Sequence, residues 1–129
     1  MIAVDTNIIV RLMTQDDAEQ YQKAHHLFAS NEIFIADSVI LECEWVLRFA
    51  YHFDSVQINT AITKLFGLPN VHLNHPALLA QTLAWHSQGL DFTDAFHLAF
   101  SQHCKTFYSF DKKMFKAAKH IDSCKVVLQ

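Results

Sequence analysis

The chain has 129 residues, of which 51% are hydrophobic and 18% are charged, so the composition excludes a disordered chain. With 2 glycines and 2 prolines there is no stretch typical of a flexible linker, and we expect one domain over residues 1–129. The net charge of −3 argues against a protein that coats nucleic acid through bulk charge, although six of the ten basic residues lie between Lys105 and Lys125.

The ends and the cysteines indicate the compartment. The first residues contain no basic segment followed by a long apolar run, so we expect no signal peptide, and no apolar run approaches the length of a membrane span. The three cysteines, Cys43, Cys104 and Cys124, are an odd number at wide spacing. We therefore expect free thiols and a cytoplasmic protein that contacts no membrane.

Short apolar runs alternate with longer amphipathic segments. In chain order we predict a strand at 2–4, helices at 8–13 and from Asp16 or Asp17 to Phe28, a strand at 33–36, helices at 37–51 and 54–67, a strand at 71–73, helices at 76–89 and 91–104, a strand at 106–109, a helix at 112–120 and a strand at 126–128. This alternation predicts an α/β fold with a central, mostly parallel sheet flanked by helices. In such sheets the functional crevice lies beyond the carboxyl ends of the strands.

Most of the thirteen acidic residues fit helix caps or a solvated surface, but several fit a site. Asp5 follows the first predicted strand, and Asp111 follows the strand at 106–109. Asp94 begins a predicted helix together with Asp91, a spacing that also suits a capping arrangement. Each of these acids alone is equally well explained as a turn or cap residue.

Glu42 is unusual for its helix. Its neighbours at three, four and seven positions are apolar, namely Val39, Trp45, Val46 and Phe49. A carboxylate on an apolar face is costly unless something compensates it, which makes Glu42 a site candidate. Glu44 points about 200° away and has Arg48 four residues on, so we expect it in a surface ion pair.

Four acids from separate elements would repel one another if they met in one crevice, and divalent cations would relieve that repulsion. Oxygen ligands with no accompanying Cys or His pattern favour Mg²⁺ or Mn²⁺, which bind phosphate oxygens and activate water. The nine histidines form no alternative site, although His97 follows Asp94 by three residues and could border the crevice. Phe92, Phe96 and Phe100 have the spacing of a helical core stripe.

Four segments resemble the motifs of PIN-domain nucleases, in the right order and over nearly the whole chain. They are Met1-Ile2-Ala3-Val4-Asp5-Thr6-Asn7, Val39-Ile40-Leu41-Glu42 with the following Trp45-Val46-Leu47-Arg48, Gly89-Leu90-Asp91-Phe92-Thr93-Asp94-Ala95-Phe96-His97-Leu98-Ala99, and Phe107-Tyr108-Ser109-Phe110-Asp111. In its length and in the residues of these motifs, the chain most resembles the VapC-type toxins of bacterial toxin–antitoxin pairs.

The resemblance implies a PIN-like fold and a Mg²⁺- or Mn²⁺-dependent endoribonuclease that hydrolyses RNA phosphodiesters with activated water. It also implies a homodimer held inactive by a cognate antitoxin protein. The acids that it assigns as catalytic metal ligands are Asp5, Glu42, Asp94 and Asp111. Accessory positions are Asn7, which would order the Asp5 turn, Asp91, and Ser109, which stands where the family often has threonine.

The lysines after Asp111 suggest how RNA would be held, because Lys112, Lys116 and Lys119 recur at helical spacing. A solvated lysine face that serves only solubility explains them equally well.

Three other functions fit the sequence less well. A PIN nuclease with a housekeeping role on RNA or DNA is the nearest alternative. A receiver-like signalling domain would need adjacent acids after the first strand and an acid after a middle strand, but Asp5 stands alone and Asn74 follows residues 71–73. An inactive binding domain fits poorly because all four acids are present.

Overall fold

The computed structural model describes residues 1–129, and they form two compact units, Met1–Asn74 and His75–Gln129. Each unit contains a small sheet with helices around it, and every strand pairing is parallel. The predicted α/β class with parallel strands is therefore confirmed. None of the helices has both the length and the apolar character needed to cross a membrane.

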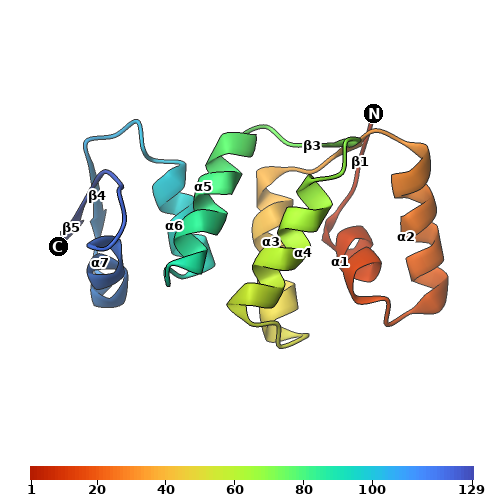
Figure 1. The fold of residues 1–129 in the computed structure, drawn as a ribbon, viewed down its shortest axis with the longest axis horizontal. Coiled ribbons are helices and arrows are strands. Elements are labelled where there is room, and N and C mark those ends of the chain that lie inside the picture. The colour runs from red at the N-terminus through yellow and green to blue at the C-terminus, as the bar shows by residue number, and fades with distance from the viewer. The chain divides into compact units, whose positions relative to one another are not determined.

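The first unit has a three-stranded sheet in the order β1-β2-β3, with Ile2 opposite Ile33 and Ile33 opposite Val71 (Figure 1). Its elements are β1 (Ile2–Ala3), α1 (Thr6–Thr14), α2 (Ala18–Ser30), β2 (Ile33–Phe34), α3 (Asp37–Phe49), α4 (Ser55–Phe66) and β3 (Val71–His72). Its core is formed by the fully buried side chains of Ile9, Ile33, Ile35, Leu47, Ile58 and Ile62.

Aspartate side chains cap three of the four helices in this unit. Asp17 accepts from the Gln20 amide at 3.0 Å, and Asp54 forms a capping box with Gln57. Both caps agree with the prediction from sequence. Helix α1 begins two residues earlier than predicted because Asp5 itself is the cap, which places Thr6 in the first turn.

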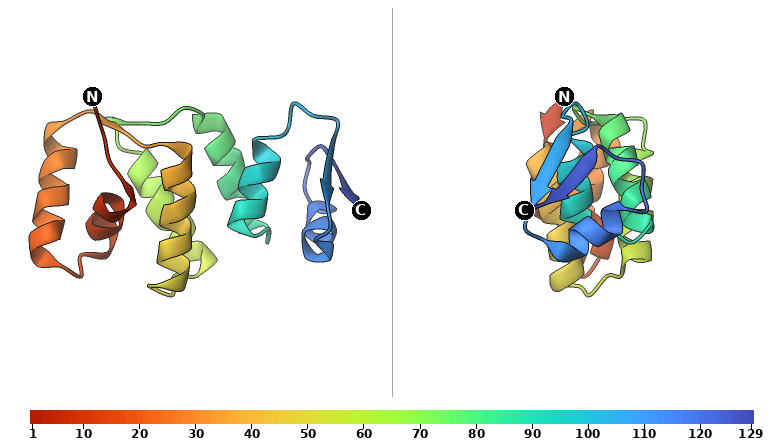
Figure 2. Two further views of the ribbon diagram at one scale, coloured as in Figure 1. Left: turned by 180° about the vertical axis from the view of Figure 1, so that it is seen from behind. Right: turned by 90° about the vertical axis from the view of Figure 1, so that its left-hand side faces the viewer.

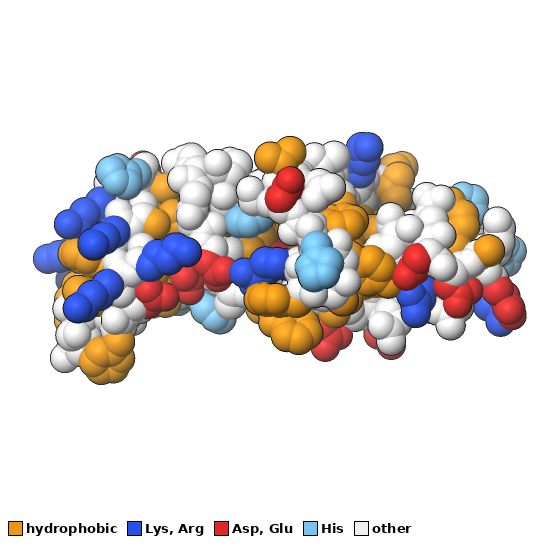
Figure 3. Space-filling model, turned by 90° about the horizontal axis from the view of Figure 1, so that it is seen from below, with side chains coloured by type: hydrophobic (Ala, Val, Ile, Leu, Met, Phe, Trp, Pro, Cys, Tyr) orange, Lys and Arg blue, Asp and Glu red, His pale blue; other side chains and the backbone are white.

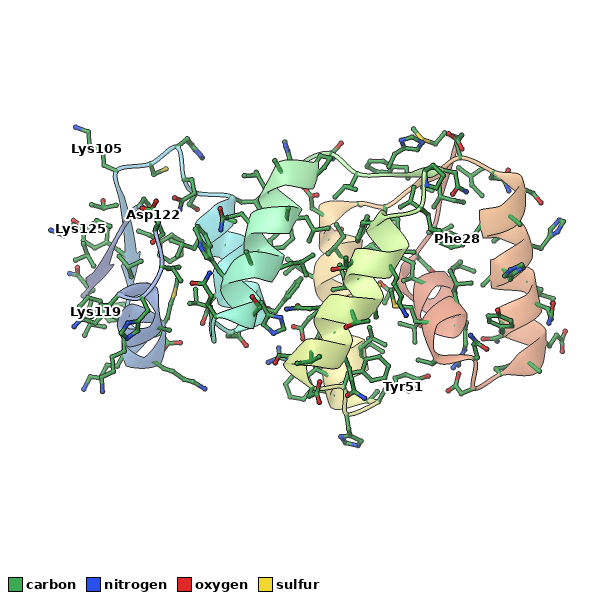
Figure 4. The ribbon with its side chains drawn as sticks, in the orientation of Figure 1. Phe28, Tyr51, Lys105, Lys119, Asp122 and Lys125 are labelled. Carbon is green, nitrogen blue, oxygen red and sulfur yellow. The ribbon has the colours of Figure 1, made fainter.

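A polar network joins the α1–α2 turn to the residue that follows the C-cap of α3. The Tyr51 hydroxyl donates to Asp16 at 2.8 Å and accepts from Arg11 Nη1 at 3.0 Å, while Arg11 Nη1 also contacts Asp16 at 3.0 Å. The hydrogen bond from Tyr51, followed by that from Thr14, lowers the pKa of Asp16. Figure 4 shows Tyr51 at the end of α3, so this network fixes that end of α3 to the end of α1.

The second unit consists of α5 (Pro76–Ser87), α6 (Phe92–Ala99), β4 (Thr106–Ser109), α7 (Lys112–Ala118) and β5 (Lys125–Leu128). Strands β4 and β5 pair in parallel from Thr106 opposite Lys125 to Ser109 opposite Leu128, and they lie side by side in the right-hand view of Figure 2. The core contains Trp85, Leu90, Ala95, Leu98, Ala99 and Met114.

The helix predicted at 91–104 is shorter than expected and ends at Ala99. The reason is local competition for its last carbonyl groups. Ser101 Oγ donates to the His97 carbonyl at 2.7 Å, and Gln102 Nε2 donates to the Leu98 carbonyl at 2.8 Å. Gln102 Oε1 also accepts from the Cys124 amide at 3.0 Å, which ties the chain after α6 to the segment before β5.

The phenylalanine stripe on α6 is a core feature, as predicted. Phe92 and Phe96 are buried, and the Phe96 ring stacks on Phe100 with centroids 4.2 Å apart. Phe92 and Phe96 face the protein interior, and the partly buried Phe100 packs against the core of this unit.

Candidate functional site

In the first unit, β1 leads directly into the acid at the start of α1. Asp5 is exposed and accepts a hydrogen bond from the Ile8 amide at 3.4 Å. A groove of about 460 Å³ runs beside it, lined by Asp5, Asn7, Ile8, Arg11, Gln20 and Lys23. The cap therefore fixes the backbone of Asp5 while leaving its carboxylate open to solvent.

Glu42 lies on α3 and is joined to the first turn of α1. The Thr6 hydroxyl, which is 4% exposed, donates to Glu42 Oε1. Burial, followed by the negative charge of Glu42 and then that of Asp5, raises the pKa of the neighbouring Cys43 thiol to about 12. The charges of Asp5 and Glu42 therefore both act on Cys43, which keeps its proton and is unsuited to nucleophilic chemistry.

The predicted orientation of α3 is wrong. The buried residues of this helix are Ile40, Cys43, Glu44 and Leu47, whereas Glu42, Trp45 and Phe49 are exposed. Aromatic residues on the outer face gave that face an apolar appearance in the sequence. Glu44 has the predicted partner, with 3.0 Å between Glu44 Oε2 and Arg48 Nε, but it is 1% exposed and not a surface residue.

In the second unit, Asp91 and Asp94 lie at the start of α6. Asp91 caps the helix and accepts from the Asp94 amide at 3.2 Å, as the spacing suggested. Burial raises the pKa of Asp94, and the charges of Asp91 and Asp111 raise it further against the opposing effect of His97 and Lys113. Asp94 is thus close enough to both other acids for their charges to disfavour its ionised form.

Asp111 begins α7 directly after β4. Its carboxylate accepts from the amides of Lys113 at 2.9 Å and Met114 at 3.1 Å, and its own amide donates to Ser109 Oγ at 3.0 Å. Ser109 therefore orders the turn that carries Asp111, a concrete role for a residue expected to be accessory. In the second unit, the charges of Asp91 and Asp111 both act on Asp94.

The donor chemistry in both units suits a hard divalent cation. Each unit offers carboxylate oxygens on open surface, and the mutual repulsion around Asp94 is the condition that a cation would relieve. Neither unit by itself gathers three or more metal-binding side chains closely enough to hold an ion. Asp5 and Glu42 in the first unit, and separately Asp94 and Asp111 in the second, offer oxygen donors of the kind that such a cation binds.

The sequence profile of the PIN domain matches residues 2–120, and the chain therefore belongs to the PIN domain family. The match extends over both units. Searches of curated proteins and of solved structures found no match. PIN domains are generally metal-dependent nucleases, so the family places this chain among the nucleases.

Three residues of these surroundings were not predicted to have a role. Thr6 lies between two assigned motif residues, and its only sequence signal is that positions 6, 9 and 10 form the inward face of α1. Lys113 acts on Asp94, whereas the lysines singled out were its neighbours. Cys43 is adjacent to Glu42 and carries no signal beyond that adjacency. The interpretation that His97 borders the acids is supported by its effect on Asp94.

Proposed function

We propose that this protein is a Mg²⁺- or Mn²⁺-dependent endoribonuclease in which Asp5, Glu42, Asp94 and Asp111 are the metal ligands. The observation that carries the proposal is the PIN family match over residues 2–120, which includes all four acids. The local geometry supports it, because each unit presents one Asp as the cap after a strand and a second acid on another helix.

The side chains have separable roles in this proposal. Asp5 and Asp111 are held by backbone amides, so their carboxylates need little reorganisation to bind an ion. Thr6 fixes the carboxylate of Glu42, and Asp91 acts on Asp94 as an accessory acid. A bound cation would supply charge stabilisation to the phosphate oxygens and would lower the pKa of water.

Metal dependence is tested on purified protein with a labelled RNA. We expect cleavage with Mg²⁺ or Mn²⁺, none in excess EDTA, and recovery when the metal is restored. A preparation of Asp5→Asn protein made in the same way controls for contaminating nuclease. Cleavage that persists in EDTA and is absent from the Asp5→Asn preparation would contradict the metal-dependent mechanism. A matched DNA strand tests the alternative of a nuclease that acts on DNA.

We further propose that the protein is the toxin of a toxin–antitoxin pair, acts in the cytoplasm and forms a homodimer. The support is the resemblance of its motifs to VapC-type toxins. Expression alone should stop bacterial growth, Asp5→Asn should abolish the arrest, and a small protein encoded beside the gene should relieve it by binding. Normal growth under strong expression of active enzyme would favour a housekeeping nuclease.

The lysines of the second unit provide the proposed contacts with RNA phosphates. Lys112 and Lys116 lie on α7, Lys119 caps its end, and all three are exposed. Figure 3 shows basic and acidic side chains next to one another on this unit, and Figure 4 labels Lys119 beside α7. Such contacts would supply affinity without sequence preference.

A further inference from the structure

Two aromatic rings lie on the outer face of α3. Trp45 is 57% exposed and Phe49 is 54% exposed, and their ring centroids are 5.2 Å apart at an interplanar angle of 50°. Because the rings are tilted, neither ring covers the other face to face. The Arg48 guanidinium lies 4.6 Å from the Phe49 centroid and occupies one side of that ring.

The same face carries the proposed metal ligand Glu42. At about 100° per residue, Glu42, Trp45 and Phe49 lie within an arc of roughly 60°. Trp45 follows Glu42 by three residues, which is about 4.5 Å along the helix axis. The Thr6 hydroxyl holds the carboxylate of Glu42, and the helix sets the spacing of the Glu42, Trp45 and Phe49 backbone positions.

We propose that Trp45 and Phe49 stack against a nucleobase of the single-stranded substrate, next to the position where Glu42 acts. The inference rests on the proposed nuclease function and names the part of the substrate that α3 contacts. Every base has a flat π face, and exposed aromatic rings are the usual partners of unpaired bases. Because the bases are neutral, the nearby carboxylates do not repel them as they would repel phosphates.

A second copy of the chain is a poorer occupant for this face. An aromatic side chain buries about 150–250 Å² when it is fully covered, so two half-exposed rings offer roughly 200 Å². A stable interface needs about 800 Å² on each partner. The exposed α3 residues next to the rings are the charged Glu42 and, in the C-cap position, the small Ala50, which extend the apolar surface little.

The experiment uses the full chain in EDTA, with a mixed-sequence single-stranded RNA and an abasic strand of the same length. The two tryptophans are distinguishable because Trp85 is 3% exposed and Trp45 is open to solvent. We expect RNA to quench the fluorescence of Trp45 and to bind about tenfold more tightly than the abasic strand. Equal binding of both strands, or no binding of RNA, would overturn the proposal.

Variants assign the effect to the two rings. Trp45→Leu/Phe49→Leu keeps apolar side chains and removes both rings, and it should lose the preference for base-bearing RNA. Trp45→Phe keeps an aromatic ring and should keep most of the preference for base-bearing RNA. Val56→Ala removes a different exposed apolar side chain, on α4, and should change nothing. A double variant that retains the preference would overturn the proposal, and circular dichroism verifies that each variant is folded.

The remaining outcomes separate this inference from the proposed function. If the wild-type protein prefers base-bearing RNA through these rings but cleaves nothing with metal, stacking stands and the nuclease function fails. If it cleaves RNA and the double variant cleaves equally well, stacking fails and the function stands. Light scattering that finds a dimeric wild type and a monomeric double variant would assign the rings to an interface between two copies of the chain. That result would overturn the proposal.

Discussion

The two units place their acids by the same local device but in different electrostatic surroundings. In each unit an aspartate two residues after the end of a short strand caps the next helix, Asp5 before α1 and Asp111 before α7. In each unit a second acid lies on another helix, Glu42 on α3 and Asp94 on α6. A helix cap thus serves as a positioning device, because backbone amides hold the acid and leave one oxygen for a ligand.

The difference lies in the partner of the second acid. Glu42 accepts a hydrogen bond from the buried Thr6, which holds its carboxylate in place. Asp94 instead has Asp91 and Asp111 nearby, and its pKa is raised. One unit therefore holds its second carboxylate through a neighbouring hydroxyl, whereas in the other unit burial and two negative charges disfavour the ionised form of the second carboxylate.

The largest expected effect comes from changing the two capping acids, Asp5→Asn and Asp111→Asn. Asparagine caps a helix as well as aspartate does, so the free energy of unfolding should change little while the charge is lost. We expect cleavage to fall at least about a hundredfold, the scale of losing one preorganised charge-stabilising group. Asp54→Asn is the matched control, since Asp54 caps α4 by the same type of bond. A fully active, folded Asp5→Asn protein would contradict the site assignment.

A smaller effect is expected for Thr6→Val, which removes the hydroxyl that holds Glu42 and keeps the shape of the side chain. Loss of a bond that orients a ligand typically costs about 10- to 100-fold in metal affinity or activity. Thr6→Ser keeps a hydroxyl and should retain much of the metal affinity that Thr6→Val loses. The affinity is measured by calorimetry. Thr82→Val is the control, because Thr82 is equally buried and donates to the Leu78 carbonyl. If Thr6→Val and Thr82→Val changed the metal affinity equally, Thr6 would contribute only through packing.

Most helices and strands could be predicted from the sequence, because local features such as helix caps and short apolar runs mark where they begin and end. Asp17 and Asp54 are strong helix caps, and β4 lies at residues 106–109 as predicted. Helix α6 was predicted too long because its end depends on side chains of Ser101 and Gln102 that bond back to the helix. That competition involves the distant Cys124, which no local pattern reveals.

The site was harder to predict because burial on a helix depends on tertiary packing. Apolar neighbours suggested that Glu42 faces inward, but Trp45 and Phe49 face outward and the inward acid is Glu44. The choice of Glu42 as a ligand stays a prediction, now supported by its bond with Thr6 and not by burial. Family motifs located the acids, while the hydroxyl that orients one of them could be found only from the structure.

The raised pKa of Asp94 predicts a pH dependence with a definite sign. Folded protein keeps this proton to higher pH than unfolded protein, so the contribution of Asp94 to stability falls as pH rises from its ordinary value of 3.8 through the raised value. Asp94→Asn should flatten the decline in unfolding free energy, measured with urea across that range. Added Mg²⁺ should bind more tightly as the pH rises, because the ion competes with the proton. A decline of equal slope in the Asn variant would show that the surroundings of Asp94 do not control it.

The smallest effect tests the lysine face of the second unit. Neutralising Lys112, Lys116 and Lys119 with glutamine should weaken the binding of every RNA, because phosphate contacts carry no sequence information. The slope of log binding constant against log salt should become shallower by about one for each lost contact. We expect Lys119 to contribute less than the other two lysines, since its ammonium already lies 4.6 Å from the Phe115 centroid. A matched triple change at the exposed Lys64, Lys105 and Lys125 removes the same charge elsewhere, so it separates a local contact from a general effect of net charge. Turnover of saturated enzyme should be unchanged in both variants, because the acids remain. If the two triple variants bind RNA alike, α7 has no special role, and the base-stacking rings on α3 would remain the sole proposed contact outside the acids.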